Sequence, residues 1–245
     1  MKRAIAGVAL AATLAVAAAA TRPFWVAPDA AQAQAWLHDA ADRRDAGAEA
    51  SLARWSARGN ASARHAYAAL LAHRADAGSR RHLEQVLGDG ADAGDAVAAT
   101  QLAELLARAG PGASRDDARL VRLLAQGSAG HVPAASRLLG LRALDATKGT
   151  PDGARAAALL GQAADQGDVP AMFLYANMLR AGQGVPRDDA RALALYQAAG
   201  DADYAPAIQA LAIAWRYGEL GLQADSSQSR LMDHEAAEAL AHAAH

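Results

Sequence analysis

The chain repeats itself about every 36 residues, and this period constrains the possible folds more than any other feature of the sequence. The stretch AGQGVPRDDAR at residues 181–191 is echoed by AGPGASRDDAR at residues 109–119, and PDGAR lies halfway between them at residues 151–155. A second marker recurs at nearly the same step, as GHVPA, GDVPA and YAPA ending at Ala134, Ala171 and Ala207. Self-similarity at such a period is typical of repeat proteins, in which each unit buries its apolar face only by stacking on its neighbours.

Each repeat contains two stretches in which apolar residues recur at helical spacing. The first stretch is Ala171, Tyr175, Met178 and Gly182, and the second is Ala192, Leu195, Tyr196 and Ala199. With 53% hydrophobic residues and many alanines, the chain favours helices whose backbones pack closely. Each repeat is therefore expected to be a pair of helices.

The loop between the two expected helices carries recognisable stop and start signals. Gly182 lies where a helix C-terminus needs a left-handed residue, and Asp188 lies where the next helix needs an N-cap. Asp189 adds negative charge at the positive end of that helix. Val185, between the glycines and the cap, is expected to fill the turn. The glycine-rich loop is therefore interpreted as a corner between two helices.

These residues resemble the Sel-one-like repeat, a relative of the tetratricopeptide repeat. Residues 167–199 align to its pattern without a gap, and the matching residues are Gly167, Asp168, Ala171, Gly182, Gly184, Val185, Asp188, Ala192, Tyr196 and Ala199. Corresponding residues in the neighbouring repeats are Gly110, Gly112, Asp116, Gly218, Gly221 and Asp225. The resemblance implies an all-α fold, a right-handed α-solenoid of about six antiparallel helix pairs that spans residues 34–245.

The first residues have the three parts of a secretory signal peptide. Lys2 and Arg3 precede an uncharged apolar run at residues 4–20, and small residues allow cleavage after Ala20 or after Ala33. We expect residues 1–33 to be the signal peptide. The alternative is an uncleaved membrane anchor within residues 1–25. The first reading predicts a periplasmic protein, and the second predicts an inner-membrane-anchored protein that faces the periplasm.

The sequence offers no recognisable catalytic or cofactor motif. It has no cysteine, and its only lysines are Lys2 and Lys148, so thiol chemistry and a phosphate-binding P-loop are excluded. Asp188 and Asp189 are consecutive on a helix, so their side chains diverge by about 100° and cannot act as an acid pair. We therefore expect no enzyme activity, no cofactor and no metal. The net charge of −2, without a basic stripe, also argues against nucleic acid as a partner.

With these alternatives set aside, the expected partner is a protein or a peptide. In solenoids of helix pairs, the first helix of each pair lines a concave groove, and we expect the partner to bind there. The residues expected on that face are His65, Thr100, Glu104, Phe173, Asn177, Arg180, Gln209 and Arg216. Replacing Phe173 and Arg180 together by Ala is expected to weaken partner capture and to leave thermal unfolding nearly unchanged. A membrane is an expected partner only if the N-terminal segment stays uncleaved.

Two classes of function follow from this reading. The first is a non-enzymatic scaffold, adaptor or regulator that acts through protein–protein interaction in the bacterial cell envelope, a role that the resemblance implies in general terms. The second is a regulator of an envelope enzyme, or an immunity-type inhibitor, that binds one exported protein in the groove. The sequence leaves both open.

Overall fold

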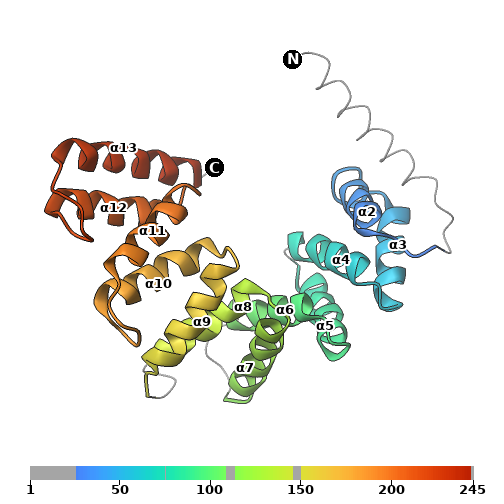
Figure 1. Cartoon of the computed structure of the whole chain (residues 1–245). Helices are drawn as coiled ribbons and strands as arrows, with labels where there is room; N and C mark the ends of the chain where they lie inside the picture. Colours follow the sequence, from blue (N-terminus) through green and yellow to red (C-terminus); the bar gives the residue numbers. More distant parts are fainter. Residues whose placement is uncertain (1–25, 75, 109–113, 146–149, 244–245) are drawn as a thin grey trace, which may run out of the picture. The chain divides into compact units, whose positions relative to one another are not determined.

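The computed structural model describes residues 26–243 apart from residues 75, 109–113 and 146–149. This part of the chain is all-α and contains twelve helices (Figure 1). They are α2 (Ala30–Asp42), α3 (Ala46–Ala57), α4 (Ala61–His73), α5 (Ala77–Asp92), α6 (Ala96–Arg108), α7 (Ser114–Ala129), α8 (Pro133–Leu144), α9 (Gly153–Asp165), α10 (Val169–Ala181), α11 (Asp189–Gly200), α12 (Ala205–Tyr217) and α13 (Ser226–Ala243). The expected all-α fold of six helix pairs is confirmed.

The chain divides into two compact units, Met1–Leu123 and Leu124–His245. Unit 1 contains α2 to α6, unit 2 contains α8 to α13, and α7 spans the boundary. We call α2, α4, α6, α8, α10 and α12, which open their pairs, the first helices. Among the described residues, no helix is both long enough and apolar enough to cross a membrane.

Most helices begin at an acidic or amide side chain that caps the N-terminus. Asp168 accepts a hydrogen bond from the Ala171 N–H at 2.8 Å, and Asp188 accepts one from the Arg191 N–H at 2.9 Å. Asp225 does the same for α13, through the Ser227 N–H at 2.7 Å. Such a cap satisfies an N–H group that has no partner inside the helix. The capping role expected for Asp188 is confirmed.

The two glycines of the α10–α11 loop have different tasks. Gly182 ends α10 in the left-handed conformation, with φ +67°, as expected, and a Cβ there would meet only ordinary contacts. Gly184 is also left-handed, with φ +70°, but a Cβ there would overlap the carbonyl group of Gly153 at the start of α9. The second glycine therefore lets the loop of one repeat touch the backbone of the preceding repeat.

The core of unit 2 is built from small residues around one tyrosine. Tyr196 is fully buried, and so are Ala171, Ala192 and Ala199 on the expected stripes. Val185 is half-buried against this core, as expected. Gly161 in α9 lies against the Tyr175 ring, where a Cβ would come within 3.2 Å of Cζ. Small side chains thus let successive helices approach closely enough to pack.

The core of unit 1 contains more leucine. Leu52, Leu87 and Leu102 are almost completely buried, and each such side chain stabilises the fold by about 1.5–3 kcal/mol. Gly90 in α5 leaves room for a buried arginine, because a Cβ there would lie 2.6 Å from Cδ of Arg64. This arginine belongs to a polar network described below.

The structure corrects several details of the sequence-based expectation. The repeated marker aligned Ala134 with Ala171 and Ala207, but the alanine of α8 that is buried like them is Ala135, because Val132 precedes α8 directly and Pro133 is its first residue. Asp116 lies inside α7, two residues after its start, and does not precede the helix. Helix α2 starts at Ala30, four residues before the expected start of the repeat domain at residue 34. Gly110, Gly112 and the N-terminal segment 1–25 lie outside the described residues.

Candidate interaction surface

The first helices share a common register counted from the residue that precedes each helix. In α4 to α12 these cap-position residues are Asn60, Asp95, Val132, Asp168 and Tyr204. The third residue after each is an alanine with no exposed surface, namely Ala63, Ala98, Ala135, Ala171 and Ala207. Positions counted from the cap can therefore be compared between repeats.

The fifth residue after the cap contacts the cap-position residue of the next first helix in three repeats. His65 Nε2 lies 2.9 Å from Asp95 Oδ2 in unit 1. Arg137 Nε lies 3.0 Å from Asp168 Oδ1 in unit 2. The Phe173 ring is 5.7 Å from the Tyr204 ring, edge to face. His65 and Phe173, which were expected to face a partner, therefore link neighbouring repeats.

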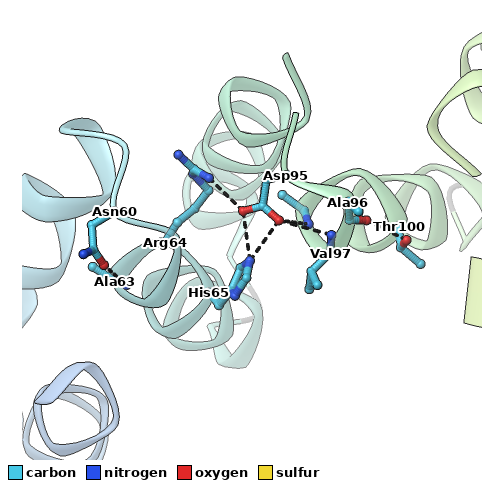
Figure 2. A network of polar contacts seen from close by, with 9 residues as sticks. Asn60, Ala63, Arg64, His65, Asp95, Ala96, Val97 and Thr100 are labelled. Carbon is cyan, nitrogen blue, oxygen red and sulfur yellow. Dashed lines mark hydrogen bonds and ion pairs between the residues drawn. The ribbon is translucent and has the colours of Figure 1, made fainter. Parts of the chain in front are cut away.

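The link in unit 1 is part of a network around Asp95 (Figure 2). Its carboxylate accepts hydrogen bonds from the Val97 and Ala98 N–H groups at the start of α6, both at 3.1 Å. It also accepts one from Arg64 Nη1 at 2.7 Å, and this arginine is only 4% exposed. One carboxylate thus caps α6, neutralises a buried guanidinium and holds His65.

The pKa of Asp95 reflects this environment. Burial on its own would raise the pKa, but the hydrogen bonds from the Ala98 N–H, His65 and Arg64 outweigh burial and lower it below its usual value of 3.8. The carboxylate is therefore ionised at neutral pH, as the buried Arg64 requires.

Asn177 and Arg180 of α10 also have partners within unit 2. The Tyr196 hydroxyl donates to Asn177 Oδ1 at 2.7 Å, so this amide satisfies the one polar atom of a buried ring. Arg180 is exposed and pairs with Glu219 at 3.1 Å. Because Glu219 follows α12, this ion pair joins the C-terminal ends of α10 and α12. Replacing Phe173 and Arg180 together would therefore disturb contacts within unit 2, so that double variant cannot separate an effect on partner capture from an effect on stability.

The remaining residues that were expected to face a partner differ in how exposed their side chains are. Thr100 is buried, and its hydroxyl donates to the Ala96 carbonyl at 2.8 Å, so it is unavailable to a partner and that expectation is wrong. Glu104 is half-buried and Gln209 is exposed. Arg216 is exposed and contacts Asp233 at 2.6 Å and Ser229 at 3.2 Å on α13.

Three exposed apolar residues on the first helices of unit 2 were missed by the sequence reading. Leu141 of α8 is 37% exposed, while Ile213 and Tyr217 of α12 are 41% and 68% exposed. Leu141 and Ile213 occupy the ninth position after the cap, where α10 carries Asn177. Counting the ninth position in every repeat would have found Leu141 and Ile213, but not Tyr217 at the end of α12.

A cleft lies beside this surface in unit 2. Its volume is about 480 Å³, and its lining consists of Arg180, Arg187, Asp189, Gly218, Glu219, Leu220 and Gly221. Arg187 pairs with Asp189 at 2.7 Å, which raises the pKa of the arginine and lowers that of the aspartate. Together with the Arg180–Glu219 pair, this gives the cleft two cations and two anions. Among the described residues, no group of three or more His, Asp or Glu side chains is arranged to hold a metal ion.

No family model and no curated protein matches the sequence. Two solved structures are similar to the fold. One is c5321, a protective antigen of uropathogenic Escherichia coli that displays an SLR fold, with a TM-score of 0.69 and 20% identity over 84% of this chain and 46% of that chain. The other is a Sel1 repeat protein from Oxalobacter formigenes, with a TM-score of 0.69 and 18% identity over 85% of each chain.

This chain matches less than half of the antigen's length. Both neighbours have the repeat architecture that the glycine and aspartate pattern implies. The chain therefore has the fold of the Sel-one-like repeat solenoids.

Proposed function

We propose that this chain is a non-enzymatic repeat protein that binds a protein partner through the first helices of unit 2. The binding residues are the exposed apolar side chains Leu141, Ile213 and Tyr217, which we call the apolar first-helix residues. Their exposure is the observation that carries the proposal. The Sel-one-like repeat fold generally mediates protein–protein interaction, which agrees with it.

The position of these residues supports an interface. The Arg137–Asp168 and Phe173–Tyr204 contacts join consecutive first helices in one register, so equivalent positions of α8, α10 and α12 follow one another. Ile213 and Tyr217 are four residues apart on α12 and therefore lie on the same side of the helix. Tyrosine with aliphatic neighbours and a rim of ion pairs is typical of an interface centre. The Arg180–Glu219 and Arg216–Asp233 pairs supply such a rim.

Capture experiments with two matched double variants test this proposal. Ile213→Ser with Tyr217→Ser removes the apolar first-helix residues of α12, while Leu231→Ser with Leu240→Ser removes similarly exposed apolar residues of α13. We expect the first variant to lose partners that the wild-type chain captures from an envelope fraction, and the second to keep them. Both should unfold at nearly the wild-type temperature, because exposed side chains contribute little to stability. Equal loss in both variants would contradict the proposal.

We further propose that the chain is exported, with the N-terminal segment acting as a signal peptide. The features of α2 favour cleavage after Ala20 over cleavage after Ala33. Asp29 caps α2 through the Gln32 N–H at 2.9 Å, and Ala33 is 1% exposed in the core. A cut after Ala33 would remove this cap and the first turn. Mass spectrometry of the exported chain should find an N-terminus before Asp29, and a mature chain that starts at Gln34 would overturn this assignment.

A further inference from the structure

Unit 1 contains a cleft of its own, which shares no residue with the surface proposed above. It has a volume of about 290 Å³ and lies where the α2–α3 turn meets the C-terminal end of α4. Its lining consists of Ala40, Ala41, Arg44, Ala46, Glu49, Leu70, His73 and Arg74. The volume equals about ten water molecules at ~30 Å³ each. The cleft therefore has room for a small ligand or for the end of a chain.

The charges in this cleft do not cancel. Glu49 is the only carboxylate in the lining, and Arg74 binds both of its oxygens, at 2.8 and 2.6 Å. The hydrogen bonds from Arg74 lower the pKa of Glu49 and overcome the opposing effect of burial, so this carboxylate stays ionised. Glu49 and Arg74 thus neutralise each other, and Arg44 and His73 remain.

Arg44 has no carboxylate partner among the described residues, although four acidic groups lie nearby in sequence and structure. Asp39 pairs with Arg43, and Asp42 pairs with His38. Asp45 caps α3 by accepting from the Gly47 and Ala48 N–H groups. The fourth is Glu49, which Arg74 holds. The guanidinium of Arg44 therefore keeps its charge and its hydrogen-bond donors for another group.

The backbone of Arg44 is also unusual. Its φ is +54°, in the left-handed region where asparagine and glycine are common and arginine is disfavoured. A residue with better backbone preferences would stabilise the turn more. His131 and Asp203 precede the next helix in the same conformation, so the left-handed backbone is a property of this turn. The observation that points to a ligand is the guanidinium at the edge of the cleft, which has no ionic partner among the described residues.

We propose that this cleft binds a carboxylate that is carried next to a short apolar group. Arg44 donates two parallel N–H bonds to the carboxylate, and His73 supplies a further donor. The methyl groups of Ala40, Ala41 and Ala46, with the nearly buried Leu70, contact the hydrocarbon. One uncompensated guanidinium matches a monoanion, and the apolar lining favours a carboxylate with a carbon chain over inorganic phosphate. Both the end of a peptide and a short fatty acid have this chemistry.

Titration of the full chain with four probes tests the chemistry of the ligand. N-acetyl-leucine represents a peptide end, hexanoate represents a free acid, and N-acetyl-leucinamide and inorganic phosphate are the controls. We expect at least one carboxylate to bind tenfold more tightly than both controls. Tighter binding of N-acetyl-leucine would assign the cleft to a chain end, and tighter binding of hexanoate would assign it to a free acid. Equal affinity for the amide or for phosphate, or no saturation by either carboxylate, would overturn the proposal.

Two variants test the site itself. Arg44→Asn removes the guanidinium and places a residue there that tolerates the left-handed backbone, so the melting temperature should stay equal or rise while carboxylate affinity falls at least tenfold. Arg43→Gln is the matched control, because Arg43 is its exposed neighbour and pairs with Asp39 outside the cleft. It should bind as the wild type does. Unchanged affinity in Arg44→Asn would show that the cleft does not use this arginine. Neither result depends on the partner surface of unit 2.

Discussion

Single residues in this chain carry contacts between neighbouring repeats. Gly184 lets one loop approach the backbone at Gly153 in the preceding repeat, and Asp95 joins α6 to Arg64 and His65 on α4. The sequence predicted that the glycines shape the corner and that an aspartate caps the helix. It did not predict what these residues touch, because the His65–Asp95 contact joins residues 30 apart that become neighbours only when repeats stack.

The two glycines of the α10–α11 loop should respond differently to alanine. Gly182→Ala places a left-handed alanine where its Cβ meets only ordinary van der Waals contacts, and it should lower the free energy of unfolding by roughly 1 kcal/mol. Gly184→Ala adds an overlap with the Gly153 backbone and should cost roughly 3 kcal/mol or more. Urea titrations followed by circular dichroism measure both values. Equal losses would mean that the contact between repeats is unimportant.

Asp95→Asn should destabilise the chain in a pH-dependent way. Asparagine can still cap α6, but it leaves the buried Arg64 without a counter-ion, which should cost about 3 kcal/mol at pH 7. The pKa of Asp95 is lowered on folding, so its contribution is complete above pH ~4 and is lost as the pH falls through the lowered value. The difference in unfolding free energy between wild type and variant should therefore shrink as the pH falls below ~4. A constant difference down to pH 2 would contradict this assignment.

At the scale of helices, the sequence predicted where most helices begin and end. It was less accurate about which positions correspond between one repeat and the next. Aspartate marks helix starts because its carboxylate accepts hydrogen bonds from the first N–H groups of the helix. Glycine marks helix ends because it adopts the left-handed backbone conformation there without a steric penalty. Val132 and Tyr204 occupy cap positions without a side-chain hydrogen bond, and a proline follows each within two residues. The proline is the first residue of α8 but the second of α12. Aligning the repeats on proline therefore paired Ala134, instead of the buried Ala135, with Ala207.

The adjacent aspartates at the start of α11 provide a matched test of this interpretation. Asp188 accepts from the Arg191 N–H, so Asp188→Ala should lower the free energy of unfolding by about 1 kcal/mol. Asp189 pairs with the exposed Arg187, and Asp189→Ala should have little effect. Thermal melts of the two single variants separate the roles. A larger loss from Asp189→Ala would mean that the ion pair orders the loop more than the cap does.

At the scale of the whole molecule, the repeat pattern predicted the fold but not the exposed apolar residues of unit 2. Any apolar residue at a stripe position is expected to be buried, and Ala171 and Tyr196 are buried as expected. The exposure of Ile213 and Tyr217 depends on which other helices pack against α12. The repeat pattern alone does not provide this information. Likewise, His65 and Phe173 occupy the expected helices, but their side chains contact the next repeat.

The central claim, that the chain binds a partner through the first helices of unit 2, can be tested directly by site-specific photo-crosslinking. A photoreactive phenylalanine analogue replaces Tyr217 in one chain and Leu240 of α13 in another, and both are produced in exporting cells. The account predicts one discrete crosslinked protein from position 217 that is absent from position 240 and disappears when Ile213→Ser is added. The same products from both positions, or none from position 217, would contradict it.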